Sequence, residues 1–242
     1  MNKPIVIIFA AGRGSRLKPY TEEMPKCLLL IDELSLIEHQ VLACNKAGLN
    51  DIVVIIGYKG ELIKQTLGNK VRYATNPKFM DSQTLYSFYC TLKEGYGKPH
   101  IHIDGDNFFD HELIEKLLEN KHENVLLVDN HAKLDDEATK ASVKNSKIEI
   151  IGKKIKNPTV EITGLMKMGP KLANDLYVRA RILKESGKMN AHVFDGMNPL
   201  LKKHELIAEP IGDLFWTEID FPSDLVRARK KAAELKVQVL ER

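Results

Sequence analysis

The sequence predicts an α/β fold with a mostly parallel sheet, helices on both faces and a small mixed β/α cap. Three features favour this class: a continuous apolar run at residues 5–9, β-rich and helical segments that alternate up to about residue 130, and a glycine-rich turn directly after the first run. A continuous apolar run is typical of a strand buried on both faces. Alternating strands and helices favour parallel strands joined by crossover helices.

The alternation assigns each element of the first 130 residues. Residues 35–48 carry apolar side chains at helical spacing and end at a glycine, which predicts a helix. After the first strand, strands are expected at 52–56, 71–74, 101–103 and 125–128, and further helices at 61–67, 84–94 and 112–120.

The pattern changes from Ala138 onward. Two short strands are expected around a polar turn at 144–146, followed by a strand at 160–168 and a helix at 172–185. A helix at 199–204, a strand at 206–210 and a C-terminal helix from Ser223 complete the expected elements. We therefore expect one domain over 1–242, with a core at 1–130, a cap at 131–215 and a return to the core at 216–242.

The composition indicates which binding partners and which cellular compartment to expect. The chain has 36 Lys and Arg against 33 Asp and Glu, a net charge of +3 over 242 residues, which argues against nucleic acid as the main partner. Its three cysteines have no metal-ligand spacing, which is typical of a reducing compartment. The apolar run at 5–9 is too short for a signal peptide or a membrane span, so we expect a cytoplasmic protein with no membrane partner.

A glycine-rich turn begins where the first expected strand ends. It reads AAGRGSRLKP from Ala10 and continues to Pro25 and Lys26. In open α/β sheets, ligands bind beyond the carboxyl ends of the strands, and small residues let backbone N–H groups approach a phosphate. Arg16 and Lys26 add positive charge. The expected nucleotide-binding residues of this turn are Ala10, Ala11, Gly12, Gly14 and Ser15; the alternative is an ordinary turn with solvated basic residues.

Carboxylates follow a strand and recur near the C-terminus. Asp104 and Asp106 end the strand at 101–103, and Glu218 and Asp220 follow Trp216. Mg²⁺ binds one or two protein carboxylates together with substrate phosphates, and these need not be adjacent in sequence. Each carboxylate, considered alone, is equally typical of a turn or of the start of a helix.

The signature AAGxGxRLxPxTxxxPK resembles that of the nucleotidyltransferases that make activated sugars and activated phospho-compounds, and the resemblance continues in order over nearly the whole chain. It implies a Rossmann-like fold of the nucleotide-diphospho-sugar transferase type. It also implies that the glycine turn holds a triphosphate, that Arg16 and Lys26 are catalytic, and that Asp106 and Asp220 hold Mg²⁺.

Three further segments indicate a subfamily. Residues 81–87 resemble the base-reading loop of cytidylyltransferases that act on phosphocholine or phosphonates, and WTEIDFPSDLVRA resembles their ending. Residues 126–155, followed by Thr163 and Gly164, are similar to the hairpin region of the inositol-phosphate and aminoethylphosphonate enzymes. The resemblance implies CMP transfer from CTP to a small acceptor of the phosphocholine, 2-aminoethylphosphonate, phosphoglutamine or inositol-phosphate type, with release of pyrophosphate. Such products are precursors of cell-surface glycans or lipids.

The resemblance and the polar chemistry of the side chains assign the remaining site residues. The nucleotide is expected to contact Ser82, Gln83, Ser87 and Asp104 in the core at 1–130. The acceptor is expected to contact Asp129, Lys140, Lys153, Thr163, Gly164, Trp216 and Glu218, most of them in or beside the cap at 131–215. Helix capping by Ser82, solvated lysines and a structural Trp216 are the alternatives.

Two other functions remain open at this point. One is a sugar-1-phosphate nucleotidyltransferase that uses UTP or TTP. The other is a non-catalytic, nucleotide-binding regulatory domain on the same fold. The chain is expected to act as a monomer or a homodimer.

Overall fold

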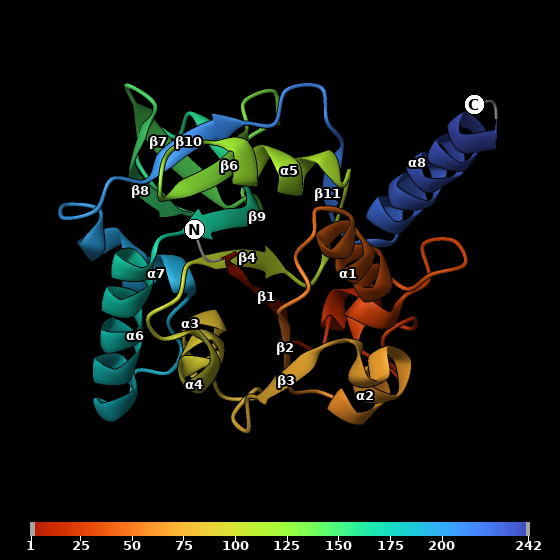
Figure 1. The fold of residues 1–242 in the computed structure, drawn as a ribbon, viewed down its shortest axis with the longest axis horizontal. Helices are drawn as coiled ribbons and strands as arrows, with labels where there is room; N and C mark the ends of the chain where they lie inside the picture. Colours follow the sequence, from red (N-terminus) through yellow and green to blue (C-terminus); the bar gives the residue numbers. More distant parts are fainter. Residues whose placement is uncertain (1–2, 241–242) are drawn as a thin grey trace.

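Nine strands form one mixed sheet in the computed structural model, which describes residues 3–240 (Figure 1). The strand order is β3-β2-β1-β4-β9-β6-β10-β8-β7. The strands are β1 (Ile5–Ala10), β2 (Ile52–Ile56), β3 (Arg72–Thr75), β4 (His100–Asp104), β6 (Val125–Asp129), β7 (Lys140–Lys144), β8 (Lys147–Gly152), β9 (Val160–Met168) and β10 (Ile207–Pro210). The α/β class is confirmed.

Helices cover both faces of the sheet, as expected. One apolar core joins the sheet to α1 (Leu36–Lys46), α2 (Gly60–Leu67) and α5 (Glu112–Glu119). A second core, on the other face, joins it to α3 (Thr84–Tyr89), α6 (Pro170–Glu185) and α7 (Val193–Met197). Successive residues of β1 alternate between these cores, which is why its sequence is continuously apolar. The remaining helices are α4 (Leu92–Gly95), α8 (Pro222–Leu240) and 3₁₀ turns at Ser15–Leu17, Lys26–Leu28, Gly68–Lys70 and Asn198–Leu200.

The sheet is less parallel than expected. Strands β1 to β4 are parallel, and β6 pairs in parallel with β10, but β9 runs antiparallel between β4 and β6. The chain makes the β7–β8 hairpin at the sheet edge and then returns through the middle of the sheet as β9. Four strands of the segment 131–215, β7 to β10, therefore belong to the main sheet, and a role of that segment in acceptor binding stays a prediction.

Two expected helices differ from the structure. The helix expected over 84–94 is interrupted between α3 and α4, where the buried Thr91 hydroxyl donates to the carbonyl of Phe88 at 2.7 Å. The helix expected over 199–204 is wrong: α7 begins earlier, at Val193, and Pro199 lies in the 3₁₀ turn that follows it. Proline lacks the backbone N–H that an α-helix interior requires, so it is confined to the first turn of a helical segment.

A separate two-stranded ribbon brings the end of the chain to the core. Strand β5 (Asn107–Phe109) pairs antiparallel with β11 (Trp216–Glu218), and Glu218 lies opposite Asn107. The backbone N–H of Ile219 also donates to the carbonyl of Asp106 at 2.9 Å. Helix α8 then begins and extends away from the sheet (Figure 1). The ribbon therefore carries Glu218 and Asp220 to the carboxyl end of β4.

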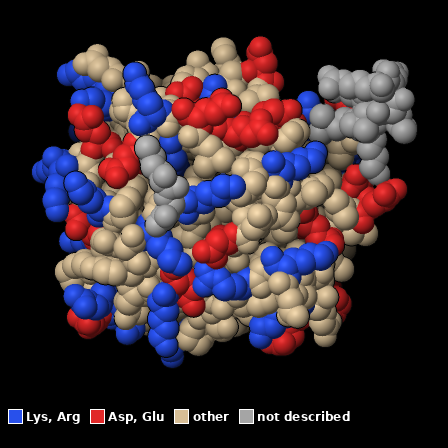
Figure 2. All heavy atoms as spheres, in the orientation of Figure 1, with Lys and Arg blue, Asp and Glu red and all other residues tan. Residues whose placement is uncertain are grey.

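The surface agrees with the near balance of charge. On the face in view, Lys and Arg side chains are interspersed with Asp and Glu side chains (Figure 2). Among the helices that the structure describes, none has the length and apolar character needed to cross a membrane.

Candidate active site

The glycine-rich turn leaves the end of β1 and packs directly against Lys26. Gly14 has a φ of 70°, in the left-handed region that favours glycine, and its carbonyl accepts a hydrogen bond from the Thr21 hydroxyl at 2.7 Å. A Cβ at Gly14 would lie 2.7 Å from the Cβ of Lys26, whereas a Cβ at Gly12 would meet nothing within 4 Å. Gly14 thus permits close contact with Lys26, and the backbone at Gly12 is open to a ligand.

The turn after β4 holds Asp106 at the same edge of the sheet. The buried Gln40 side chain, on α1, donates to the carbonyls of Asp104 and Asn107 at 2.9 and 2.7 Å. A Cβ at Gly105 would lie 2.3 Å from the carbonyl oxygen of Phe9, so only glycine lets this turn approach β1 so closely. These contacts hold the turn that carries Asp106 against β1 and α1.

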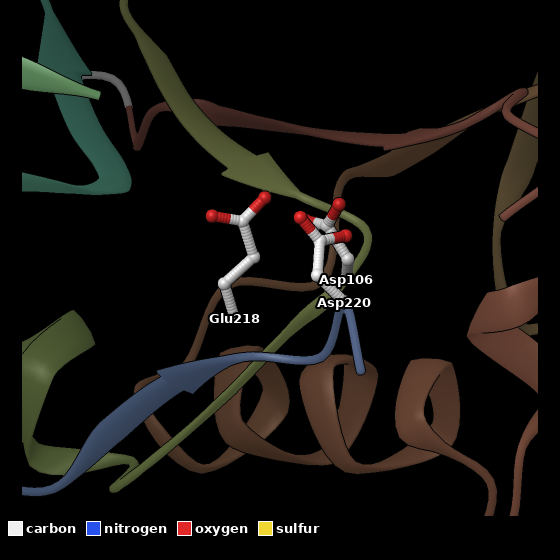
Figure 3. A group of neighbouring side chains, drawn as sticks. All are labelled: Asp106, Glu218 and Asp220. Carbon is white, nitrogen blue, oxygen red and sulfur yellow. The ribbon is translucent and has the colours of Figure 1, made fainter. Parts of the chain in front are cut away.

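Three carboxylates converge at this edge. Asp106 and Asp220 lie close together, and Glu218 lies across from them on β11 (Figure 3). One oxygen of each carboxylate lies within 4.8 Å of one oxygen of the other two. The Lys26 ammonium lies between the two aspartates, with Nζ 2.9 Å from Asp106 Oδ2 and 2.7 Å from Asp220 Oδ1. Arg16 Nη1 lies 3.3 Å from Asp220 Oδ2. The structure therefore brings together the four residues expected to perform catalysis and to bind the metal.

The pKa values of these groups are shifted by burial and by one another. Burial alone would lower the pKa of Lys26, but the charges of Asp106 and Asp220 outweigh it and raise the pKa. Burial raises the pKa of Asp106, and Lys26 partly offsets this effect. Burial would also raise the pKa of Asp220, but Lys26 holds it below the usual value. Lys26 is thus a firmly charged ammonium between two carboxylates.

The donor set of this cluster fits Mg²⁺. Asp106, Glu218 and Asp220 offer only oxygen ligands, which Mg²⁺ prefers, and a protein magnesium site commonly uses one or two carboxylates and completes its coordination with phosphate oxygens and water. The open space beside the cluster is sufficient for a phosphate chain: a cavity of about 210 Å³ is lined by Gly14, Ser15, Arg16, Leu17, Lys26 and Asp220.

A larger cavity of about 590 Å³ adjoins the carboxylates. Of the predicted site residues, its lining includes Ala11, Gly12, Ser87, Asp104, Asp106, Lys153 and Glu218. Ala10 lines a third space of about 140 Å³, together with Gly12 and Lys26. The cavity extends from the glycine turn to the β7–β8 hairpin and the start of α7, so it can hold two ligand groups side by side.

Asn76, which was not among the expected site residues, joins Ser82 and Ser87. The buried Asn76 side chain donates from Nδ2 to the hydroxyl oxygens of Ser82 and Ser87, at 3.0 and 2.9 Å. Asn76 directly follows β3, and polar residues at the carboxyl end of a strand are the signal that could have identified it. Gln83 occupies the N-cap position of α3 without a capping side-chain hydrogen bond, and its backbone N–H donates to the carbonyl of Met189 at 3.0 Å.

Several predicted acceptor residues lie outside the lining of the large cavity. Lys140 is buried and donates to the carbonyl of Asp135 at 2.5 Å, and the buried Thr163 hydroxyl donates to the carbonyl of Leu127 at 3.0 Å. Gly164 has a φ of 69°, and a Cβ there would lie 2.3 Å from Asp104 Oδ2. The Trp216 indole N–H donates to Asp129 Oδ2 at 3.1 Å. In this structure the side chains of Lys140, Thr163 and Trp216 bond to protein groups, and the backbone at Gly164 lies against Asp104, which lines the cavity.

Two polar contacts at the site had no sequence signal. Glu137 lies in the loop before β7 and pairs with Arg16 (Oε2 to Nη1, 2.8 Å), with Lys153 Nζ 3.9 Å from the same oxygen. His102 is 2% exposed and lines the large cavity, with Nε2 3.0 Å from Asp104 Oδ1. Its ring stacks on Phe9 at a centroid distance of 4.1 Å. Glu137 and Arg16 are distant in sequence, so their pairing has no local signal. The contacts of His102 depend on which face of β4 its side chain occupies.

Comparison with known proteins identifies two similar cytidylyltransferases. A choline-phosphate cytidylyltransferase of Streptococcus pneumoniae is 40% identical over 105 residues, which cover 42% of this chain and 44% of that relative. A CTP:phosphoglutamine cytidylyltransferase of Campylobacter jejuni is 28% identical over 246 residues, which cover 90% of this chain and 96% of the relative. The match therefore spans less than half of the first relative and nearly all of the second.

The fold is also that of a solved nucleotidyltransferase. The inositol-1-phosphate CTP transferase from T. maritima superposes with a TM-score of 0.76 at 24% identity, over 96% of this chain and 97% of that chain. The model of the MobA-like NTP transferase domain matches residues 6–166, which include the glycine turn, Lys26 and Asp106. These findings confirm the expected fold type and the expected class of enzyme, a nucleotidyltransferase. The chain belongs to the family of MobA-like NTP transferase domains.

Proposed function

We propose that this enzyme is a Mg²⁺-dependent cytidylyltransferase that transfers CMP from CTP to a small phosphate or phosphonate acceptor and releases pyrophosphate. The observation that carries the proposal is the cluster of Lys26, Arg16, Asp106 and Asp220 between a phosphate-sized space and a cavity of about 590 Å³. The names of the two relatives support the choice of CTP and of a phosphorylated acceptor.

The site divides into a nucleotide half and an acceptor half. The triphosphate lies over the turn from Gly12 to Arg16, and the base lies toward Ser87, which Asn76 orients. Asp106 and Asp220 hold the magnesium ion, which neutralises charge on the phosphates when bound. Lys153 and Glu218, which both line the large cavity, contact the acceptor. The other expected acceptor residues lie outside that lining: Asp129, Lys140, Thr163, Gly164 and Trp216.

The reaction requires no protein base. A phosphoryl or phosphonyl oxygen of the acceptor, already anionic near neutral pH, attacks the α-phosphorus of CTP. A new P–O bond forms, the bond from the α-phosphorus to the bridging oxygen breaks, and pyrophosphate leaves with that electron pair. Lys26 and Arg16 place positive charge where negative charge develops, and the cavity holds the two reactants in line, so catalysis consists of positioning and charge stabilisation.

The cavity lining favours an acceptor with a hydrogen-bonding end. Its aromatic lining residues, apart from histidine, are Phe9 and Phe194, and the indole of Trp216 instead bonds to Asp129. A quaternary ammonium is bound best by several aromatic faces. Carboxylates at Glu218 and Asp195 suit a primary amine or a polyol. We therefore rank the aminoethylphosphonate, phosphoglutamine and inositol-phosphate types above phosphocholine.

Pyrophosphate release tests the proposal directly. CTP, UTP, TTP and ATP are each combined with phosphocholine, 2-aminoethylphosphonate, a phosphoglutamine-type acceptor, inositol phosphate and glucose-1-phosphate. We expect release with CTP and one phospho-acceptor. Preference for UTP or TTP with glucose-1-phosphate would establish the sugar-phosphate alternative, and no release with any pair would favour a binding domain.

A Lys26→Ala variant tests the assigned catalytic group. We expect turnover to fall by orders of magnitude while circular dichroism shows an intact fold, because the variant removes a positive charge that the transition state requires. Near-normal pyrophosphate release by a folded Lys26→Ala protein would refute the assignment.

A further inference from the structure

Lys26 occupies the position where the two metal-binding carboxylates meet. Its Nζ lies within hydrogen-bonding distance of both Asp106 Oδ2 and Asp220 Oδ1, and its side chain is 14% exposed. A Mg²⁺ ion that bridges the same two oxygens must lie about 2.1 Å from each. An ion on the lysine's side of these oxygens would overlap the ammonium group or lie in contact with it, and two adjacent cations repel each other strongly where solvent screening is weak. The lysine therefore competes with an ion for these two oxygens.

The ammonium also removes the charge that would attract a metal ion. Asp106 and Asp220 form the base of the carboxylate cluster, and one lysine satisfies an oxygen of each. A second cation, Arg16, lies 3.3 Å from the other oxygen of Asp220. Lys26 and Arg16 therefore offset the charges of the two aspartates, and Arg16 also pairs with Glu137. A divalent cation must break these contacts to bind.

We propose that Lys26 is the resident cation of the nucleotide-free site and that it blocks metal binding until a triphosphate draws it away. The inference rests on the proposed function for one premise, that Asp106 and Asp220 are the metal ligands. Lys26 thereby makes the order of binding conditional: the nucleotide and the divalent cation bind together, and the cation alone binds weakly.

The surroundings of Lys26 allow this exchange. Lys26 and Asp220 both line the space of about 210 Å³ beside the glycine turn, which also contains Gly14, Ser15 and Arg16. A triphosphate in that space offers the ammonium several anionic oxygens, and a lysine reaches them by rotating its own side chain, because its charge is a point charge on a flexible stem. When Lys26 moves to the phosphates, the two carboxylates are left without their partner and become an attractive site for a divalent cation.

Binding of Mn²⁺, followed by electron paramagnetic resonance without nucleotide, tests the proposal. Lys26→Met keeps most of the side-chain volume and removes the charge. We expect Mn²⁺ to bind Lys26→Met at least tenfold more tightly than the wild type. The matched control is Lys64→Met, which removes a lysine paired with Glu61 on α2 and is expected to leave the affinity unchanged. Wild-type affinity equal to that of Lys26→Met would overturn the proposal.

Two further measurements localise the effect. The double variant Lys26→Met/Asp220→Asn should lose the gained affinity, and a double variant that retains the full gain would place the ion elsewhere and overturn the proposal. Addition of CTP without an acceptor should raise Mn²⁺ affinity in the wild type, and an unchanged wild-type affinity would contradict the exchange. Lys26→Gln provides the same comparison if the methionine variant does not fold.

The two proposals fail in different ways. If the wild type transfers CMP with Mg²⁺ but Lys26→Met gains no affinity for Mn²⁺, the lysine block is wrong and the proposed function stands. If Lys26→Met gains affinity but no nucleotide supports transfer, the block stands and the proposed function is wrong. Failure of both proteins to bind Mn²⁺ would overturn the lysine block.

Discussion

Replacement of Gly14 by alanine should destabilise the protein and displace Lys26. Gly14 combines two constraints: a φ of +70°, and a Cβ position only 2.7 Å from the Cβ of Lys26. Ordinary contacts of a Cβ lie at 3.4–4 Å, so the neighbour must shift by more than half an ångström. A Cβ atom moves only with its own backbone, so the shift must move the start of the Lys26–Leu28 turn.

The expected loss of stability in Gly14→Ala has two parts. The left-handed backbone costs an alanine about 1–2 kcal/mol, and the overlap with Lys26 adds about 1–3 kcal/mol, as for other overpacked sites. We therefore expect Gly14→Ala to lower the free energy of unfolding by about 2–5 kcal/mol. Turnover should fall by about 10²-fold, because a catalytic group displaced by about 1 Å loses its alignment.

Equilibrium urea unfolding of three variants tests this reasoning. Gly97→Ala carries only the backbone penalty, because its φ is +80° and nothing lies within 4 Å of the new Cβ. It should lose about 1–2 kcal/mol. Gly12→Ala meets no neighbour and has no positive φ, so its stability should stay within about 1 kcal/mol of the wild type. If Gly14→Ala were no less stable than Gly97→Ala, the contact with Lys26 would carry no cost and the reasoning would be refuted.

Three other predictions concern charge and pH. Glu137→Ala should lower the KM for the nucleotide, because Glu137 competes with phosphate for Arg16. The control is Glu23→Ala, which removes an exposed carboxylate paired with Lys59. Equal KM values for Glu137→Ala and the wild type would contradict the prediction. Burial lowers the pKa of His100 from 6.5 to about 4, so the unfolded chain takes up the proton at a higher pH than the folded protein does. The free energy of unfolding should therefore fall by up to about 3 kcal/mol as the pH drops from 6.5 to 4. Urea unfolding of His100→Gln should lack this slope, and a slope equal to that of the wild type would assign it to other groups. Burial, followed by the charges of Asp129 and Asp135, raises the pKa of Glu161 to about 7, so its contribution to stability is present below pH 4.5 and lost as the pH rises through 7. Glu161→Gln should therefore be more stable than the wild type at pH 8 and lose this advantage by pH 4; an equal difference at both values would contradict the assignment.

The parts of the fold that were predicted correctly are those that local chemistry determines. The apolar run of β1 reflects burial on both faces, and the glycine turn after it requires a positive φ at Gly14. Residues that follow a parallel strand lie at one edge of the sheet, so the glycine turn and Asp106 were expected to be neighbours. The helix expected over 199–204 was predicted incorrectly, because α7 ends at Met197 and Pro199 lies in the short 3₁₀ turn that follows it.

The meeting of Asp220 with Asp106 depends on pairing between distant segments. Strands β5 and β11 have three residues each, and the backbone hydrogen bonds that pair them carry little sequence signature. The sequence placed Asp220 at the site only through the resemblance to a known family. Asn76 and Glu137 were missed because their partners lie on other segments of the chain.

The sequence by itself determined the α/β class, the two covered faces of the sheet, the glycine-rich turn and the family that the chain resembles, because periodicity, glycine geometry and motif spacing are properties of short segments. Only the tertiary structure decided that β9 runs antiparallel through the sheet and that Lys26 lies between Asp106 and Asp220. These contacts depend on how distant segments approach one another and on the side-chain conformations that result. The position of the lysine is therefore the feature from which the metal-binding order of this enzyme can be tested.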